Sequence, residues 1–154
     1  MVASNTASID IFERIVSLVH EATGHGVNIM GDGGRILASS DPTRVGTVHD
    51  GGRRVMSGEV EEVAIDADTA ATLRNVKAGY MGAVRMDGKL IACIGIGGEP
   101  HEVKPLQKMA ALSLKQELER ERLAGRERGL LQDVRRDIGD IAERMQVLSL
   151  NGAV

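Results

Sequence analysis

The chain has 154 residues, of which 42% are hydrophobic and 27% are charged, and its net charge is -3. This length and composition suit one compact domain, or a smaller domain with an extension. The mild negative charge gives no attraction for nucleic acid or an anionic membrane, and a chain with Phe12, Tyr80 and no tryptophan is poorly equipped to stack on bases.

The single cysteine, Cys93, excludes a disulfide within the chain. Residues 1–10 lack the basic and apolar regions of a signal peptide, and no stretch reaches the ~20 apolar residues of a membrane span. The sequence therefore predicts a cytoplasmic protein without a membrane anchor.

The first third of the chain predicts a helix followed by a hairpin. Apolar residues recur at helical spacing from Asp10, which with Glu13 fits a capping box, and Gly24 would end this helix. The segments 27–30 and 35–39 flank a glycine-rich turn and are expected to be paired strands.

The middle of the chain predicts a short helix over 47–57 and a strand over 59–65, whereas residues 66–77 give no clear pattern. Two clearer strands, 81–86 and 90–96, are joined by an Asp-Gly dipeptide, a strong signal for a two-residue hairpin turn.

From His101 the composition predicts a long helix, rich in Leu, Glu, Arg, Gln and Ala. Its second half has apolar residues spaced alternately by three and four: Leu131, Val134, Ile138, Ile141, Met145 and Leu148. This is a heptad seam, which a lone helix cannot bury. We therefore expect a homo-oligomer, such as a dimer, formed through the helices.

The order of these elements predicts an α+β protein: a PAS-like antiparallel sheet with flanking helices, followed by a long C-terminal coiled-coil helix. We expect a ligand-binding domain over 1–124, and a heptad helix over 125–154 for oligomerisation or signalling.

Residues 39–49 concentrate groups that suit a small polar ligand. Arg44 could hold a carboxylate in a bidentate pair, and His49 could bond to a hydroxyl or carboxylate of the ligand. The alternative is a polar loop in which Arg44 is solvated and Thr47 caps the next helix.

A second segment, 95–101, leads from a strand through Gly97 and Gly98 into the long helix. Backbone amides at such a junction suit an anion, although an ordinary strand–helix connection would look the same. The segment is not a dinucleotide-binding fingerprint, because Pro100 occupies the position of the last glycine in that motif. Together the two segments favour one small anion held at the ends of the strands.

Other polar residues give weaker signals. His20 and His25 are five apart, one more than a helical zinc motif requires, and Cys93 has no neighbouring base in an apolar strand. We therefore expect no metal, no cofactor and no enzymatic activity. An enzyme acting on a hydroxy acid, with His49 as general base, is the alternative that lacks an evident carboxylate partner.

Several segments resemble the sugar-diacid recognition domain, the N-terminal part of bacterial carbohydrate diacid regulators. The matching segments are Asn28-Ile29-Met30, Gly34 to Ser39, Asp41 to Gly46, His49, Val76 to Gly79, Gly88 to Ile91, Ile94 to Pro100 and Glu102-Val103. The resemblance extends over roughly residues 11–118 and implies a PAS-like fold.

The resemblance also implies a ligand and a pocket. The ligand would be a sugar diacid or a small hydroxy acid of the glycerate, glucarate or galactarate class. The pocket would contain Ser39, Arg44, Val45, Gly46, His49, Tyr80, Met81, Gly97 and Gly98. In it Arg44 would neutralise a carboxylate, His49 would fix a second polar group, and amides near Gly97 and Gly98 would complete an oxyanion cradle.

One segment departs from the family. Where the family tends to have Asn and Pro, this chain has Tyr80 and Met81 after Gly79. The segment should line the pocket, so the departure bears on the identity of the ligand. Tyr80 would either close the pocket and offer a hydroxyl, or be a core aromatic.

The usual output of that family, a helix-turn-helix domain, does not follow, and we expect no direct binding to nucleic acid. Instead residues 138–153 are similar to the signalling tip of methyl-accepting chemotaxis proteins, which implies a complex with a histidine kinase. Because the tip would turn at Val154, we expect either a truncated chain or a remnant used for assembly.

These observations predict a soluble sensor that binds a small carboxylate and relays occupancy through its C-terminal helix, in transcription regulation or chemotaxis-like signal transduction. The rival hypothesis is a structural assembly module with a vestigial pocket.

Overall fold

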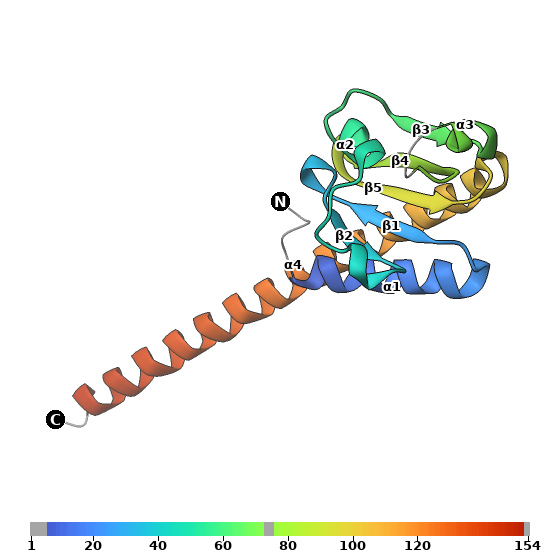
Figure 1. Ribbon diagram of the computed structural model, residues 1–154. Helices are drawn as coiled ribbons and strands as arrows, with labels where there is room; N and C mark the ends of the chain where they lie inside the picture. Colours follow the sequence, from blue (N-terminus) through green and yellow to red (C-terminus); the bar gives the residue numbers. More distant parts are fainter. Residues whose placement is uncertain (1–5, 73–75, 153–154) are drawn as a thin grey trace. The chain divides into compact units, whose positions relative to one another are not determined.

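The computed structural model describes residues 6–72 and 76–152, with side chains up to residue 146 (Figure 1). The sheet consists of β1 (Val27–Met30), β2 (Ile36–Ser39), β3 (Glu62–Ile65), β4 (Gly79–Met86) and β5 (Lys89–Gly97). The helices are α1 (Thr6–Thr23), α2 (Asp50–Met56), α3 (Ala67–Ala71) and α4 (Pro100–Gly152), with 3-10 turns over Asp32–Gly34 and Pro42–Arg44. The sheet is antiparallel in the order β2-β1-β5-β4-β3, which confirms the predicted α+β fold with a long C-terminal helix.

Each face of the sheet has its own apolar cluster. On one face, α1 and the first part of α4 enclose the larger cluster, in which Phe12, Ile94 and Leu114 are buried. On the other face, α2 covers a smaller cluster that includes Met30, Met81 and Cys93 (Figure 1). Because successive residues of a strand point to opposite faces, β1, β2, β4 and β5 each contribute to both clusters.

The first helix begins earlier than its sequence signal. It starts at Thr6 rather than at Asp10, so the predicted capping box is wrong. Ser8, in the added turn, is 5% exposed, so packing of this turn extends the helix past the local cap signal. The end is as predicted: Gly24 has a φ of 74° and donates to the carbonyl of His20 at 2.8 Å.

The second helix is shorter than predicted because a different residue caps it. His49 Nδ1 accepts from the amide of Gly52 at 3.3 Å, and α2 begins at Asp50. Thr47, the expected cap, donates its hydroxyl to the carbonyl of Arg44 at 2.6 Å and stays in the preceding loop.

The two hairpins follow their local signals. In the turn between β4 and β5, Asp87 and Gly88 have φ angles of 51° and 75°, as a two-residue turn with left-handed residues requires. The resulting strand β5 is central in the sheet and has a buried run of five residues, 92–96.

The last helix begins at Pro100, and Pro105 lies within its early turns. The helix continues through Gly125 and Gly129. The chain divides into two compact units, residues 1–118 and 119–154. Within the described ranges, every helix is too short or too polar to cross a lipid bilayer.

Candidate functional site

The face of the sheet under α2 has a row of side chains that changes from polar to apolar. The strand register aligns Ser39, Asn28, Gly95, Met81 and Val63 across β2, β1, β5, β4 and β3. The two residues at the β2 end are polar and the two at the β3 end are apolar. Gly95 in the middle has no side chain, so the row is lowest there.

The walls of this low point are close. A Cβ atom placed on Gly95 would lie 3.4 Å from Met81 Cβ and 3.5 Å from Met30 Cε. Asn28 is the neighbour of Gly95 on β1 and is half-buried. Gly95 is buried, and the two methionine side chains fill the space directly over it.

The N-terminus of α2 forms the roof. A Cβ atom on Gly51 would be 3.0 Å from Met81 Cε and 3.4 Å from His49 Cε1, and one on Gly52 would be 3.0 Å from Met30 Cγ. Since real Cβ atoms rarely tolerate such distances, two glycines let α2 lie directly on the two methionines. The same geometry places His49 beside Met81.

His49 is half-buried at this face and its imidazole is neutral. Burial, and secondly the charge of Arg44, lower the pKa of the imidazole. The ring is therefore neutral at pH 7, and because Nδ1 accepts from Gly52, its proton resides on Nε2.

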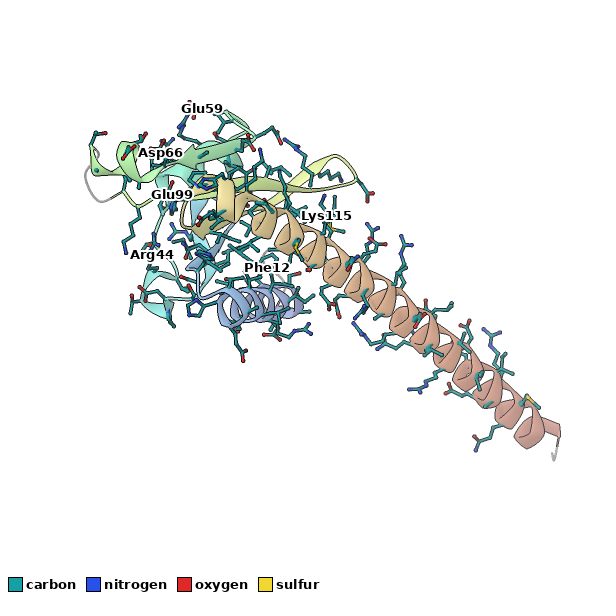
Figure 2. All side chains as sticks on the ribbon, turned by 90° about the vertical axis from the view of Figure 1, so that its right-hand side faces the viewer. Phe12, Arg44, Glu59, Asp66, Glu99 and Lys115 are labelled. Carbon is teal, nitrogen blue, oxygen red and sulfur yellow. The ribbon has the colours of Figure 1, made fainter. Side chains whose placement is uncertain are left out.

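Arg44 is held at the polar end of the row. With the Asn28 amide oriented so that its oxygen faces the guanidinium, Arg44 Nη1 donates to it at 3.2 Å and the amide nitrogen donates to Ser39 Oγ at 2.6 Å. Arg44 itself is exposed at the end of its 3-10 turn, which Asp41 caps by accepting from Thr43 N. Figure 2 shows Arg44 on the same side of the molecule as Glu99, which follows β5.

Asn28 was not among the residues expected in the pocket. An isolated polar residue in a short strand has no spacing that marks it as functional. What could have identified Asn28 is its position between Val27 and Ile29. Those two residues face the larger core, so the alternation of the strand places Asn28 on the opposite face.

The Gly97–Gly98 turn lies at the same end of the sheet as the Arg44 segment. Ser40 N donates to Val27 O at 2.9 Å and Gly97 N donates to Gly26 O at 2.9 Å, so β2, β1 and β5 end side by side. However, Gly98 N also donates to a backbone carbonyl, that of Ala78, at 3.0 Å. The expected cradle of unpaired amides is therefore wrong in this structure, because both amides extend the pairing of the sheet.

Val45 and Gly46 shape the loop between Arg44 and His49. Gly46 has a φ of 89°, donates to Ile36 O at 2.8 Å and accepts from Arg35 Nη1 at 2.5 Å. Val45 is 47% exposed. Gly46 thus holds the loop against β2, whereas Val45 lies at its surface.

Tyr80 and Met81 are separated by the alternation of β4. Tyr80 is 1% exposed in the larger cluster, its hydroxyl donates to Glu62, and Lys104 Nζ lies 5.4 Å from the centre of its ring. Burial raises the pKa of this hydroxyl further above its ordinary value. Of the two interpretations of Tyr80, the structure has the core aromatic, and Met81 is the residue that faces α2.

Cys93 and the potential metal ligands are the remaining groups to consider for reactivity. Cys93 is fully buried under α2, and burial raises the pKa of its thiol to about 12, so it stays protonated at neutral pH. In the part of the chain that the structure describes, His, Cys, Asp and Glu nowhere gather in threes as a metal site would require.

Comparisons with known proteins agree with this architecture. The model of the family described as "Putative sugar diacid recognition" matches residues 8–135. The chain is 34% identical over 98 residues to the carbohydrate diacid regulator of Escherichia coli strain K12, covering 63% of this chain and 25% of the regulator. It is 33% identical over 122 residues to the uncharacterized protein YsfB of Bacillus subtilis strain 168, covering 77% of this chain and 33% of that protein. The chain thus spans about a quarter to a third of the length of these relatives.

Among solved structures, the blue-light absorbing form of the PixJ GAF domain from Thermosynechococcus elongatus has a TM-score of 0.58 and 17% identity. The match covers 80% of this chain and 92% of that domain. At this identity the likeness shows the fold alone, which is of the GAF type.

Proposed function

The chain belongs to the sugar diacid recognition family, and from this membership and the geometry of the α2 face we propose that it is a ligand-sensing regulatory domain that binds a small hydroxy acid. The ligand carboxylate would pair with Arg44, and a hydroxyl or second carboxylate oxygen would accept from His49 Nε2. The observation that carries this proposal is that one short loop attaches both donors to the same row of the sheet: Arg44 bonds to Asn28, and a neutral His49 lies beside Met81.

The charge and hydrogen-bond inventory favours an anionic ligand with hydroxyl groups. Arg44 and His49 Nε2 are both donors, and a carboxylate accepts from two donors at once. Asn28 and Ser39 add an amide and a hydroxyl beside the guanidinium. Such a set recognises an acid with a neighbouring hydroxyl better than a neutral sugar, for which aromatic platforms are common.

Sensing is favoured over catalysis. A histidine acting as general base is commonly oriented by a carboxylate on its other nitrogen, whereas His49 Nδ1 faces the amide of Gly52. Asp50, the neighbouring acid, pairs with Arg53 at 2.8 Å.

Occupancy would reach α4 through the two strands that form the floor. Gln107 of α4 donates to the carbonyls of Gly82 on β4 and Ile94 on β5, at 3.2 and 3.1 Å. Gly98 packs on Val103, where an added Cβ would be 2.8 Å from Cγ1. A shift of β4 against β5 would therefore be felt at the start of the helix.

The next partner in this proposal is a second copy of the chain, joined through the exposed apolar residues of the second unit. The similarity of residues 138–153 to a chemotaxis signalling tip favours a histidine kinase complex as the step after that. The same exposed seam supports the second candidate function, an assembly module whose pocket has no ligand.

Calorimetric titration with glycerate, glucarate and galactarate tests the sensing proposal. The wild-type chain should bind at least one of these acids, and Arg44→Ala should weaken that binding roughly tenfold or more, because a charge-assisted pair is lost. Arg14→Ala is the matched control, since it removes an exposed guanidinium from α1 on the opposite face of the sheet.

Two results would overturn the proposal. One is the absence of binding by all three acids to the wild-type chain, which would leave the assembly module as the better account. The other is equal binding to wild type and Arg44→Ala, which would move the site away from the α2 face.

A further inference from the structure

We propose that the first unit pairs with a second copy of the chain through the outer face of α1, which lies antiparallel to α1 of that copy. The proposed ligand site is under α2, on the other face of the sheet, so this inference goes beyond that function and does not depend on it. It also concerns a surface of the first unit, residues 1–118, and not the apolar seam of the second.

A groove between α1 and α4 marks this surface. Its volume is about 1040 Å³, and its lining residues all belong to the first unit. Ile11 and Ile15 form its floor, since both are buried, whereas Leu18 also lines it and is 60% exposed. The side chain of Leu18 therefore lies beside a hollow that is large enough to receive side chains of another helix.

Further apolar side chains are exposed on the same layer of helices. On α4, Met109 and Leu112 are 66% and 57% exposed, and Met109 lies about one helical turn before Ser113, which lines the groove. Apolar side chains exposed beside a groove are typical of a surface that associates with another protein.

The charges along α1 favour a second α1 as the occupant. Exposed residues spaced by four, three and four along the helix form one stripe: Asp10, Arg14, Ser17 and Glu21. When Ser17 of one copy faces Leu18 of an antiparallel second copy, Arg14 of each helix lies beside Glu21 of the other. Within the described residues, neither Arg14 nor Glu21 forms an ion pair in its own chain. The pairing therefore gains two symmetric ion pairs and covers Leu18 of both copies.

Other arrangements of the same two helices bring like charges together. In an antiparallel pair shifted by about one turn, with Arg14 facing Ser17, Asp10 of each helix would lie beside Glu21 of the other. In a parallel pair in register, each residue of the stripe would face the same residue of the second copy, so Arg14 would face Arg14. The charge pattern thus selects both the orientation and the register.

Cross-linking through position 17 tests this pairing in the full chain. Because Cys93 is buried and protonated at neutral pH, Ser17→Cys adds the accessible thiol. A short bismaleimide should join two copies of this variant, since position 17 lies next to the two-fold axis of the pair. Asp68→Cys, which places the thiol at an exposed position of α3, is the matched control and should give several-fold less cross-linked dimer.

Charge exchange in the Ser17→Cys background tests the register. Arg14→Glu and Glu21→Arg should each raise, by roughly tenfold at low salt, the protein concentration that gives half-maximal cross-linking. The variant with both changes should restore the starting concentration. Leu18→Glu should reduce cross-linking to the level of the Asp68→Cys control, because it places two carboxylates at the centre of the pair. The exposure of Leu18 lets this variant fold as the wild type does.

Three results would overturn the proposal. One is cross-linking at position 17 no stronger than at position 68, which would leave the groove to a partner other than this chain. Another is cross-linking that neither charge reversal nor Leu18→Glu weakens. The third is a double charge variant no better than the single ones, which would contradict the antiparallel register. Each of these results leaves the sensing proposal standing, because that proposal uses the opposite face of the sheet.

Discussion

His49 caps α2, and in the proposed function it would also bond to the ligand. Its Nδ1 accepts from Gly52, which places the proton of the neutral ring on Nε2, the donor that the proposed function uses. Because the cap needs an unprotonated Nδ1, protonation of the ring would remove the cap and place a second positive charge near Arg44. The structure thus links the stability of α2 to the charge of one imidazole.

This link predicts a dependence of stability on pH. Burial and Arg44 lower the pKa of His49 in the folded state, so the unfolded state binds more protons just below the ordinary histidine pKa, about 6.5. The free energy of unfolding should therefore fall as the pH is lowered from 7 to 5. His49→Asn keeps a capping side chain that does not titrate, and should reduce this decline.

Urea unfolding at pH 7, 6 and 5 measures the effect for both proteins. His101→Asn is the control, since this histidine is exposed at the start of α4. Parallel stability curves for wild type and His49→Asn would show that the imidazole is not the group responsible.

Single residues also show what chemistry alone can predict. Arg44 and His49 were predicted to contact a ligand because their functional groups lie close together in the sequence, and this remains a prediction. The amides of Gly97 and Gly98 were misjudged, because their partners, the carbonyls of Gly26 and Ala78, belong to distant segments. Whether an amide is paired depends on tertiary structure, and no local pattern records it.

Two adjacent residues of β4 also show that a local pattern does not determine tertiary surroundings. Tyr80 and Met81 were expected in one pocket because they are neighbours in a segment that departs from the family. In β4 they point to opposite faces, so only Met81 lies under α2. Knowing the strand was insufficient without knowing which helix covers each face.

At the scale of elements, the turn after β1 is fitted closely to α2. Gly33 and Gly34 both have positive φ angles, 69° and 77°. A Cβ on Gly33 would meet nothing within 4 Å, whereas one on Gly34 would lie 2.6 Å from Arg53 Cα, in the backbone of α2. The two neighbours thus share a conformation and differ in their surroundings.

We therefore expect different costs for the same substitution. Gly33→Ala should lower the free energy of unfolding by about 1 kcal/mol, the cost of a non-glycine residue with positive φ. Gly34→Ala should cost at least about 2 kcal/mol more, because a helix backbone must also move. Urea unfolding of the two variants measures the difference, and equal losses would mean that α2 is not packed against this turn as described.

Elements defined by local chemistry were predicted well. The Asp87-Gly88 turn and the glycine-rich turn after β1 each contain the residues that their backbone angles require. The starts of α1 and α2 were misplaced, because packing of Ser8 and capping by His49 decide them. Strand β3 and helix α3 had weak signals, since each is short and largely exposed.

At the scale of the whole molecule, element order was enough for the fold class and not for the site. Hairpins β1–β2 and β4–β5 follow from the sequence, but the pairing of β1 with β5 joins residues nearly seventy positions apart. That pairing brings Asn28 beside Gly95 and so creates the floor. A long-range register of this kind is not encoded in any one segment.

The second unit contains the apolar seam through which we propose that two copies of the chain associate. Its seam residues are Leu131, Val134, Ile138, Ile141 and Met145, each between 44% and 64% exposed. The side chain of Leu148, the last expected seam residue, lies outside the described residues. An exposed apolar stripe at heptad spacing is stabilised when a second helix covers it.

The charges beside this seam favour an antiparallel pair. When Ile138 faces Ile141 of a second copy, the whole seam overlaps, and Asp137 of each helix lies beside Arg144 of the other. In a parallel pair in register, Asp137 would lie beside Ala142 and gain no ion pair. The antiparallel arrangement therefore gains two symmetric ion pairs that the parallel one lacks.

Exchanging the charges distinguishes the two arrangements. Asp137→Arg and Arg144→Asp should each weaken self-association of the full chain, by roughly tenfold at low salt, because each replaces two attractions with two repulsions. The double variant should restore the wild-type dissociation constant, as measured by sedimentation equilibrium. The matched control exchanges Asp133 and Arg136, an exposed pair 3.9 Å apart on another side of the helix, and should change nothing. A double variant no better than the single ones would contradict the antiparallel pair, and a monomeric wild type would contradict assembly through this seam.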